Sequence, residues 1–530
     1  MDPCDENRIQ RRKAALARRA GGHTGRKQRR TAGTSSKAVR PGLVGGSYRP
    51  LSDRDMERIH QTALDVLENI GMASPIPILR EHALAKGCRI DERGRLCFPR
   101  ALVEDILAAA SRGYVAHGRD PDNDREISGS RVHFDAGGES VLTLDFASGR
   151  YRSSTLIDLY DFARLVDRLD HVHVFSRVVS ATDVVDLFAN DVNTAYASMA
   201  GTSKHIHLTF SDAKHVDAAI AMMDLILGGE GRHLERPFCS SGGCPVVSPL
   251  TYAAENSEVC IAATRMGGNV AVVIAPQAGA TAPAALAGTL VQTVAETLAA
   301  LLLVNLVVPG HPVGFGPWPF VSDLRTGAFS GGGGEEAVLN AAAAQIGNFY
   351  GLPTIVGAGM TDSKLADNQA GYEKGVSVAL SALAGANIIS ETTGMLASLM
   401  GCSFEAMVID NEMLGCIQRA LRGIEVTDET LSYQVIRDVA YGEGHFLGHP
   451  QTLELMETEY LYPEIADRSA PSAWQEAGAH DIRERARQRA KQLLSSHYPG
   501  YIDRSTDEKI RARFPIALPR EAMQPGNDRW

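Results

Sequence analysis

The 530-residue chain lacks several patterns that would define its class at once. Its eight cysteines are widely spread and include no CxxC pair, which excludes a zinc ribbon and a disulfide framework, and no secretory leader begins the chain. The longest apolar run, residues 297–308, is twelve residues long, whereas a membrane span needs about 20. We therefore expect reduced cysteines, no membrane-spanning helix and a cytoplasmic protein.

Positive charge is scarce outside the first 50 residues. Those residues contain 13 Lys and Arg against 3 Asp and Glu, and the remaining residues contain 40 against 60. Because a basic surface supplies most of the affinity for nucleic acid, the acidic body is not expected to bind it. Residues 1–47 are rich in Arg, Gly and Ala without apolar periodicity. They are predicted to form a disordered basic arm.

Helical periodicity begins directly after this arm. Ser52 followed by Asp55 resembles a capping box, and apolar residues recur at helical spacing from Met56 until Gly71 ends the pattern. Short helical and extended pieces then alternate as far as residue 170. We predict an N-terminal α+β elaboration over residues 48–170, ahead of the main domain.

A regular alternation of strands and helices follows from residue 171. Strands that are nearly all apolar and alternate with helices imply a parallel sheet covered by helices, and eight such units close a (β/α)8 TIM barrel, which we place at 171–425. A doubly wound open sheet is the alternative, but the GxGxxG that would follow its first strand is missing. A C-terminal helical extension packing on the barrel is predicted over 426–530. The eight predicted strands are 172–178, 204–210, 237–240, 269–275, 312–316, 353–358, 387–390 and 405–410.

The loops after the fifth to eighth predicted strands carry the candidate site residues, because a TIM barrel places its active site at the C-terminal ends of its strands. Their polar side chains suggest a small polar or cationic ligand, and Phe315, Trp318 and Phe320 can form an aromatic wall against it. These rings can instead form a hydrophobic plug, and Asp362 and Lys364 can form a salt bridge that orders their loop. The further substrate-binding candidates are Tyr372, Glu391 and Asp410.

Two His-x-His pairs, His171/His173 and His205/His207, place both side chains on one face of a strand, as two metal ligands require. With Asp410 after the eighth predicted strand, the second pair favours a metal-dependent barrel hydrolase as the alternative function. No histidine follows predicted strands five to seven, where the remaining ligands should lie. We therefore predict no metal site.

Several segments together resemble the trimethylamine methyltransferase family, the corrinoid-dependent methyltransferases. The likeness extends from Ser47 to about Pro499. It implies a TIM barrel that transfers a methyl group from a methylated amine to the Co(I) of a corrinoid on a separate small protein, with no tightly bound cofactor. The segments are Leu-Ser-Asp at 51–53, Leu-Glu-Asn-Ile-Gly at 67–71, Asp-Leu-Arg-Thr-Gly at 323–327, Gly-Leu-Pro at 351–353, Thr-Asp-Ser-Lys at 361–364, Asp-Asn-Gln-Ala-Gly at 367–371 and Phe-Leu-Gly-His-Pro-Gln-Thr at 446–452.

The resemblance also implies a branch of the family. Its archaeal trimethylamine branch carries pyrrolysine in the loop after strand six, at or near Leu365 by motif matching, whereas this chain has ordinary residues throughout that loop. The pyrrolysine-free branch acts on quaternary amines such as glycine betaine. A quaternary ammonium leaves as a neutral amine without a general acid, so the enzyme mainly positions the methyl carbon.

The same loop supplies the predicted catalytic residues, Asp362, Lys364 and Gln369. A cognate corrinoid protein and a homo-oligomer are the expected partners. A catalytically silent betaine-binding protein is a third hypothesis, and it predicts ligand affinity without turnover.

Overall fold

The computed structural model describes residues 37–527 and 529–530. The chain forms two compact units: residues 41–422 with 463–530 make the larger one, and residues 423–462 belong to the smaller one. Most of the predicted basic arm, residues 1–36, lies outside the described residues. Residues 43–44 of that arm form strand β1 (Leu43–Val44), which pairs antiparallel with strand β6 (Arg131–Phe134) of the larger unit.

Eight parallel strands close a barrel in the larger unit. Backbone pairing joins five of them in one sheet and three in another, and the parallel bridges Asp135 to Val174 and Phe315 to Thr354 join the two sheets at both edges. The prediction of a (β/α)8 barrel is therefore confirmed. In order around the barrel the strands are β6 (Arg131–Phe134), β9 (Val174–Ser176), β10 (His205–Leu208), β11 (Cys239–Gly243), β14 (Val270–Ile274), β16 (Val313–Pro317), β19 (Ile355–Gly357) and β20 (Ile388–Ser390).

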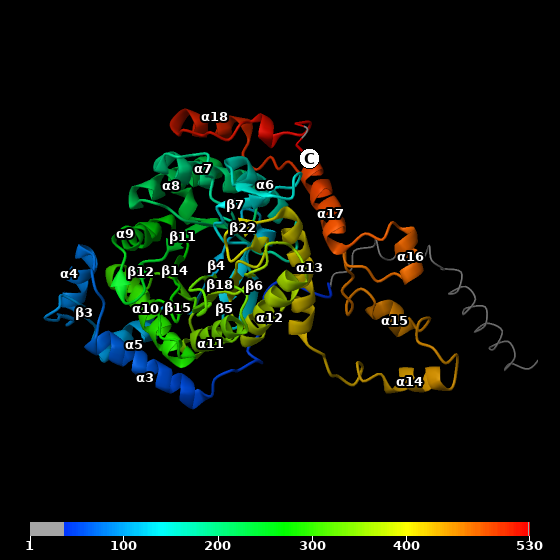
Figure 1. Cartoon of the computed structure of the whole chain (residues 1–530), viewed down its shortest axis with the longest axis horizontal. Helices are drawn as coiled ribbons and strands as arrows, with labels where there is room; N and C mark the ends of the chain where they lie inside the picture. The colour runs from blue at the N-terminus through cyan, green and yellow to red at the C-terminus, as the bar shows by residue number, and fades with distance from the viewer. Residues whose placement is uncertain (1–36, 528) are drawn as a thin grey trace, which may run out of the picture. The chain divides into compact units, whose positions relative to one another are not determined.

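A helix follows each barrel strand, and Figure 1 shows these helices as a ring around the strands. One of them, α10, is long and apolar enough to cross a membrane by length and composition, yet 83% of its most apolar window is buried inside the protein. It is a core helix that packs against α3 (Asp53–Asn69) and the strands β14 and β16. The ring comprises α6 (Leu156–Val166), α7 (Leu187–Gly201), α8 (Val216–Leu227), α9 (Ala254–Ala263), α10 (Leu286–Val307), α11 (Gly334–Tyr350), α12 (Asn368–Ala384) and α13 (Phe404–Arg422).

The seven predicted strands from 172–178 to 387–390 are the second to eighth strands of the barrel, so the prediction begins and ends one strand too late. Residues 405–410, predicted as the eighth strand, are the first turns of α13. Ser403 begins this helix, since its hydroxyl accepts from the Ala406 amide and its carbonyl accepts from the Met407 amide. The first barrel strand is β6, which the prediction placed in the N-terminal elaboration because Arg-Val-His-Phe has no continuous apolar run.

Ahead of the barrel, α3 begins where the sequence predicts. The Ser52 hydroxyl accepts from the Asp55 amide, and α3 buries Met56, Ile59 and Leu67. The remaining elements of this part are α3 (Asp53–Asn69), α4 (Pro77–Ala85), α5 (Arg100–Ala109), β2 (Arg89–Ile90), β3 (Leu96–Cys97), β4 (Gly113–Ala116) and β5 (Arg125–Ser128).

Small sheets decorate the loops that connect barrel strands to their helices. One joins the loop after β6 to the loop after β20, and the others lie in the loops after β11, β14 and β16. They comprise β7 (Leu142–Leu144) and β8 (Tyr151–Ser153) with β21 (Met395–Leu396) and β22 (Gly401–Cys402), β12 (Val246–Val247) with β13 (Thr251–Tyr252), and β15 (Gln277–Ala278) with β17 (Phe320–Ser322) and β18 (Phe329–Ser330).

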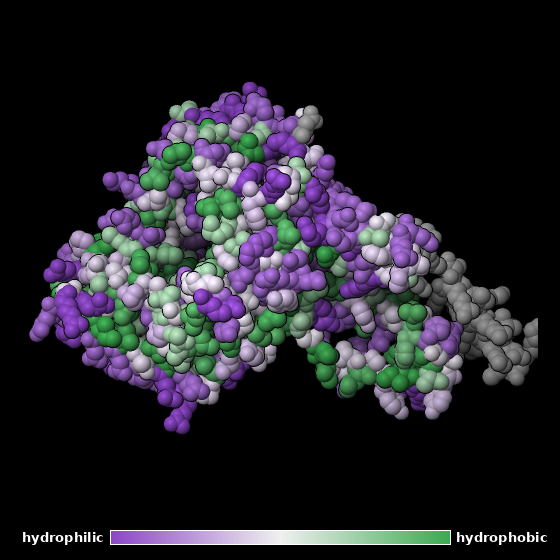
Figure 2. Space-filling model, viewed as in Figure 1, coloured by the Kyte–Doolittle hydropathy of each residue, from purple (hydrophilic) through white to green (hydrophobic). Residues whose placement is uncertain are grey.

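The C-terminal residues divide between the two units. In the larger unit, α17 packs on α13 and α6, and the buried guanidinium of Arg164 donates to carbonyls of Leu494 and His497. In the smaller unit, α14 leaves Tyr433 and Ile436 exposed, and Figure 2 shows apolar side chains among polar ones over this unit. The helices are α14 (Tyr433–Ala440), α15 (Pro450–Leu455), α16 (Pro471–Glu476), α17 (Ile482–Ser496) and α18 (Arg504–Arg513).

Candidate active site

Small inward-facing side chains leave the upper part of the barrel open. Ser176 on β9, Ser240 on β11 and Ala271 on β14 line a cavity of about 650 Å³ at the C-terminal ends of the strands. On β16 the inward position is Gly314, where a Cβ would come within 2.7 Å of the Ile355 side chain. Most TIM barrels fill this space with bulky side chains. The cavity volume lies within the range of small-molecule sites.

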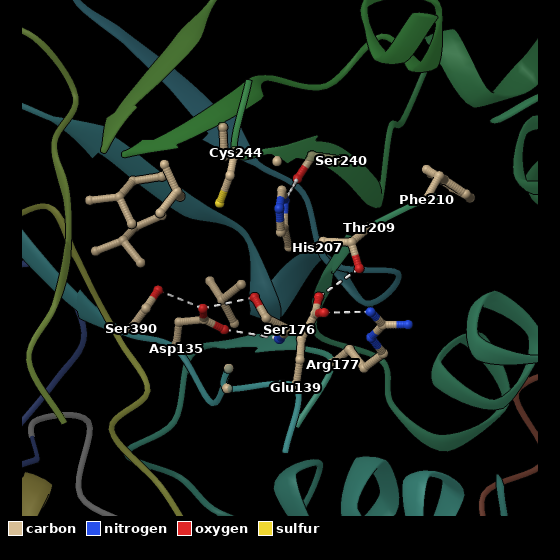
Figure 3. A pocket seen from close by; sticks show the side chains of 18 of the residues that line it. Asp135, Glu139, Ser176, Arg177, His207, Thr209, Phe210, Ser240, Cys244 and Ser390 are labelled. Atoms are coloured by element: carbon tan, nitrogen blue, oxygen red, sulfur yellow. Dashed lines mark hydrogen bonds and ion pairs between the residues drawn. The ribbon is translucent and has the colours of Figure 1, made fainter. Parts of the chain in front are cut away.

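Asp135, directly after β6, is the best-held carboxylate of the cavity. It accepts from the Ser176 amide at 2.9 Å and from the hydroxyls of Ser176 and Ser390 at 2.8 Å each (Figure 3). Burial raises the pKa of Asp135 to about 6, although these hydrogen bonds favour the ionised form. Asp135 is therefore mostly ionised at neutral pH and gives the cavity wall a buried negative charge.

Glu391, the first residue after β20, is held far less completely. It adopts a left-handed backbone conformation with φ of 66°, is 5% exposed, and its Oε2 atom has no partner among the described residues. Burial, with Asp135 and Glu139 nearby, raises the pKa of Glu391 to about 8. Without a cation beside it, this carboxyl is mostly protonated at neutral pH.

Glu139 forms an ion pair with Arg177 and accepts from the Thr209 hydroxyl at 2.6 Å (Figure 3). Burial alone would raise the pKa of Glu139, but the Arg177 guanidinium lowers it below its usual range. The pair is thus ionised on both sides. The pair adds no net charge to the cavity. The ionised Asp135 therefore leaves the region around Glu391 with a net negative charge.

Trp318, after β16, gives the cavity an aromatic surface. Its indole nitrogen donates to the Ile355 carbonyl at 3.1 Å, and its ring packs 5.9 Å from that of Phe320. Gly357 lies beneath the ring, where a Cβ would come within 2.7 Å of it. Trp318 is therefore fixed in place, with part of its ring facing the cavity.

Both His205 and His207 face the cavity, as their spacing on β10 predicts. The Ser240 hydroxyl lies between them, at 2.8 Å from His205 Nε2 and 3.3 Å from His207 Nδ1. Burial lowers the pKa of each imidazole to about 4, so both are neutral. Among the described residues no three His, Cys, Asp or Glu side chains are placed to hold a metal ion.

Comparison with known proteins identifies the family to which the chain belongs. The family model of trimethylamine methyltransferase matches residues 18–516. The chain belongs to the trimethylamine methyltransferase family. It is therefore an enzyme that transfers methyl groups, and the resemblance expected from its sequence motifs is confirmed.

Individual members of the family cover nearly the whole chain. A trimethylamine methyltransferase of Desulfitobacterium hafniense is 34% identical over 86% of this chain and 90% of its own length. A glycine betaine methyltransferase of the same species is 28% identical over 88% and 96%. The crystal structure of a Methanosarcina barkeri monomethylamine methyltransferase aligns over 85% of this chain and 96% of its own, with a TM-score of 0.43 and 13% identity.

Two of the predicted site residues of this methyltransferase, Trp318 and Glu391, line the cavity. Phe315 points outward instead, because it alternates with the inward Gly314, and its ring meets Tyr350 in the buried helix layer. Phe320 is buried behind Trp318. The structure therefore brings one ring of the three to the cavity wall.

The other predicted residues lie around the cavity rather than on its wall. Asp410 is in α13, where its carboxylate accepts from Lys374 at 2.6 Å and from the Gly394 amide at 2.7 Å. Tyr372 is 62% exposed on α12. Lys364 donates to the Asp362 carbonyl, and Gln369 donates to the Glu373 carboxylate at 2.9 Å. The salt bridge considered between Asp362 and Lys364 does not form.

Asp362 connects three loops. Its carboxylate accepts from the Ser330 hydroxyl and the Gly331 amide at 2.7 Å each, and from the Ser398 hydroxyl at 2.6 Å. Glu373 in turn accepts from the Asp362 amide at 2.9 Å. These bonds tie together the loops after β16, β19 and β20. A catalytic role for Asp362, Lys364 and Gln369 stays a prediction.

Sequence reasoning missed Asp135, Glu139 and Arg177. Asp135 and Glu139 follow β6, and their role was hidden because that strand was assigned outside the barrel. The sequence Asp-Ala-Gly-Gly-Glu after a strand is itself a signal, since glycines let a loop turn closely over a barrel mouth. Arg177 is the last residue but one of the strand predicted at 172–178, and only the nearby histidines were weighed there as site residues.

Proposed function

We propose that this methyltransferase takes a methyl group from a quaternary amine, such as glycine betaine, and delivers it to the Co(I) of a corrinoid presented by a separate protein. The observation that carries the proposal is the pairing of an aromatic face, Trp318, with an incompletely bonded carboxyl, Glu391, in one cavity. Among the relatives, one is named for glycine betaine, a quaternary amine, and another for trimethylamine, a tertiary amine, so the names support a methylated amine as the substrate.

The cavity residues suit a permanent cation. The Trp318 face attracts N-methyl groups by cation–π contact, at about 0.5–2 kcal/mol. A bound cation also favours the ionised form of Glu391, so the carboxyl and the ligand stabilise each other. Asp135 adds a second negative charge that does not depend on the ligand. These contacts hold the nitrogen and direct a methyl carbon toward the open end of the cavity.

The chemistry asks little more of the protein. The corrinoid supplies the nucleophile, Co(I). Because the departing amine is neutral, the attraction of the ligand nitrogen to Glu391 and Trp318 weakens during the reaction, and excess attraction would raise the barrier. Positioning is then the main contribution of the chain. We infer modest substrate affinity and turnover that depends on orientation.

The cavity also bears on how the corrinoid approaches. A volume of about 650 Å³ holds a methylated amine with room for its substituents, but not a corrin ring with its nucleotide tail. This favours a corrinoid carried on another protein that docks over the strand ends, and no tightly bound cofactor. A homo-oligomer remains the expected assembly.

The test supplies the full chain with free Co(I)-cobalamin and one amine at a time, and follows methylcobalamin by its absorbance. Glycine betaine or another quaternary amine should react, and trimethylamine should be inert. Preference for trimethylamine would contradict the branch assignment. Ligand binding without methylcobalamin would favour the silent binding protein, and hydrolysis that needs an added metal would favour the hydrolase.

A further inference from the structure

The cavity wall differs in character on its two opposite sides. Trp318, Ile355 and Ile388 come from β16, β19 and β20 or directly after them, whereas Arg177 and Thr209 directly follow β9 and β10. In the closed order of eight strands, β9 and β10 lie four positions from β16 and β19, which is directly across the barrel. The aromatic ring of Trp318 thus faces a side that carries the polar Arg177 and Thr209 together with the apolar Val174 and Phe210.

Arg177 is the single Lys or Arg side chain among the cavity-lining residues that the structure describes. Its Nη2 atom donates to the Glu139 carboxylate. Its Nε atom is buried without a partner, and its Nη1 atom makes no hydrogen bond to a described residue. The Arg177 side chain is 13% exposed and is held by its ion pair with Glu139, whose other oxygen accepts from the Thr209 hydroxyl. A guanidinium with donors to spare thus borders the cavity.

The neighbours of Arg177 leave those donors for a ligand. The Asp191 carboxylate lends negative charge to this region but makes no hydrogen bond to Arg177; its Oδ2 atom accepts from the Ser211 amide and hydroxyl and contacts His215. His207 is neutral at physiological pH, since burial lowers its pKa to about 4. Among the described residues that line this side of the cavity, Arg177 is the one cation available to an anionic group.

We propose that Arg177 binds the carboxylate of a zwitterionic methylated amine whose ammonium lies against Trp318 on the opposite wall, with Glu391, which follows β20 two strands away from β9, in the same cavity. The inference deepens the proposed function, on which it rests, by assigning the group that selects betaines over purely cationic amines. Arginine suits this role because its planar fork retains donors for a second carboxylate after pairing with the first. A ligand without a carboxylate leaves the buried Nε and the Nη1 donors unpaired, which costs affinity.

The experiment measures binding to the full chain by isothermal titration calorimetry with four probes: glycine betaine, 4-trimethylammoniobutanoate, choline and tetramethylammonium. The two zwitterions cover a short and a longer separation between nitrogen and carboxylate. At least one zwitterion should bind about tenfold more tightly than choline. Arg177→Gln should weaken that zwitterion about tenfold or more and change choline affinity less than threefold.

Two further variants separate recognition from folding. Arg504→Gln removes an exposed arginine on α18 and should alter no affinity. Glu139→Gln should weaken choline and leave the advantage of the zwitterion at least as large, because Arg177 then has one acceptor fewer. Thermal melting of each variant checks that it is folded.

The outcomes distinguish this inference from the function itself. Equal weakening of choline and the zwitterions in Arg177→Gln overturns the inference and makes Arg177 a structural partner of Glu139. Wild-type preference for choline over both zwitterions overturns it as well. If no quaternary amine yields methylcobalamin, the proposed function fails, whatever the binding series shows.

Discussion

Two acidic groups near the barrel mouth differ in how completely their oxygens are bonded. Beside the cavity, Asp362 in the loop after β19 and Glu373 in α12 receive hydrogen bonds at all four carboxylate oxygens. In the cavity, Glu391 has an oxygen without a partner among the described residues. A carboxylate whose oxygens are all occupied stabilises its loops, and one with an oxygen to spare can receive a ligand. The two groups differ in the number of hydrogen bonds that their carboxylate oxygens accept, and a polar sequence motif does not show this difference.

The largest effect should come from a carboxylate that stabilises the helix layer, Asp410 in α13, when its cationic partner in α12 is removed. Lys374 is 1% exposed and pairs with the buried Asp410, which also holds the Gly394 amide. Lys374→Met strands a buried carboxylate, so the free energy of unfolding should fall by about 3–5 kcal/mol. Denaturant unfolding measures it. The matched change Arg504→Met, in an exposed pair with Glu508, should leave the midpoint nearly unchanged. Equal effects would mean that burial is not what matters.

Breaking the cavity side should affect binding. Trp318→Ala removes the aromatic face, and affinity for quaternary amines should fall by roughly one to two orders of magnitude. Calorimetry gives the affinity, and circular dichroism checks the fold, since the variant also loses the hydrogen bond to Ile355. Trp318→Phe, which keeps a π face, should retain more affinity than the alanine variant. Unchanged binding in both would assign Trp318 to packing alone.

Asp362 tests whether a fully bonded carboxylate can still be catalytic. Asp362→Asn turns an acceptor of three hydrogen bonds into a partial donor, and should cost about 1–3 kcal/mol of stability. If the residue only joins loops, quaternary amine affinity stays within about twofold of wild type, as measured by calorimetry. Full stability with methyl transfer abolished would instead support the catalytic role predicted from the family motif.

Glu391 should make binding depend on pH. Its pKa of about 8 in the empty cavity means that the ionised form, which attracts the cation, grows from about a tenth at pH 7 to about nine tenths at pH 9. Choline affinity should therefore rise about tenfold over this range. A quaternary nitrogen does not titrate, so the change reports the protein. Glu391→Gln should bind choline with little pH dependence, and a persistent rise would point to another group.

The smallest effect concerns the basic arm. Deleting residues 2–36 should leave methyl transfer to free cobalamin within about twofold, because the family motifs quoted from the sequence begin only at residue 51, although the family model itself starts at residue 18. Any loss should occur only with the cognate corrinoid protein and should diminish with added salt. The deletion must stop before Leu43, since β1 pairs with barrel strand β6. A folded but inactive variant would indicate that the arm reaches the site.

Much of the fold follows from local patterns, and the cavity does not. Helical spacing and the Ser52 cap predict α3 correctly, and apolar runs identify seven of the eight barrel strands. The eighth, β6, is predicted as an extended piece at 131–134, but only its pairing with β9 and β20 shows that it belongs to the barrel. Residues 405–410 are apolar enough for either structure, and the Ser403 cap selects the helix.

The same reasoning explains which site residues the sequence identifies. Trp318 and Glu391 follow strands that were correctly placed, and both line the cavity. Phe315 was misjudged because side chains alternate along a strand, and a glycine at the inward position leaves no apolar signal. The Glu139–Arg177 pair joins residues 38 apart from two strand ends. Such a pair depends on barrel closure, which one sequence does not display.

The barrel can close only late in the synthesis of the chain. Strand β6 pairs with β20, whose residues emerge more than 250 positions later, and β19 pairs with β20 on the other edge. A nascent chain that ends before residue 388 therefore carries two unpaired parallel edges, which are prone to wrong association. Contacts this distant in sequence are slow to form. The enzyme gains its cavity only when its last barrel strand is released from the ribosome.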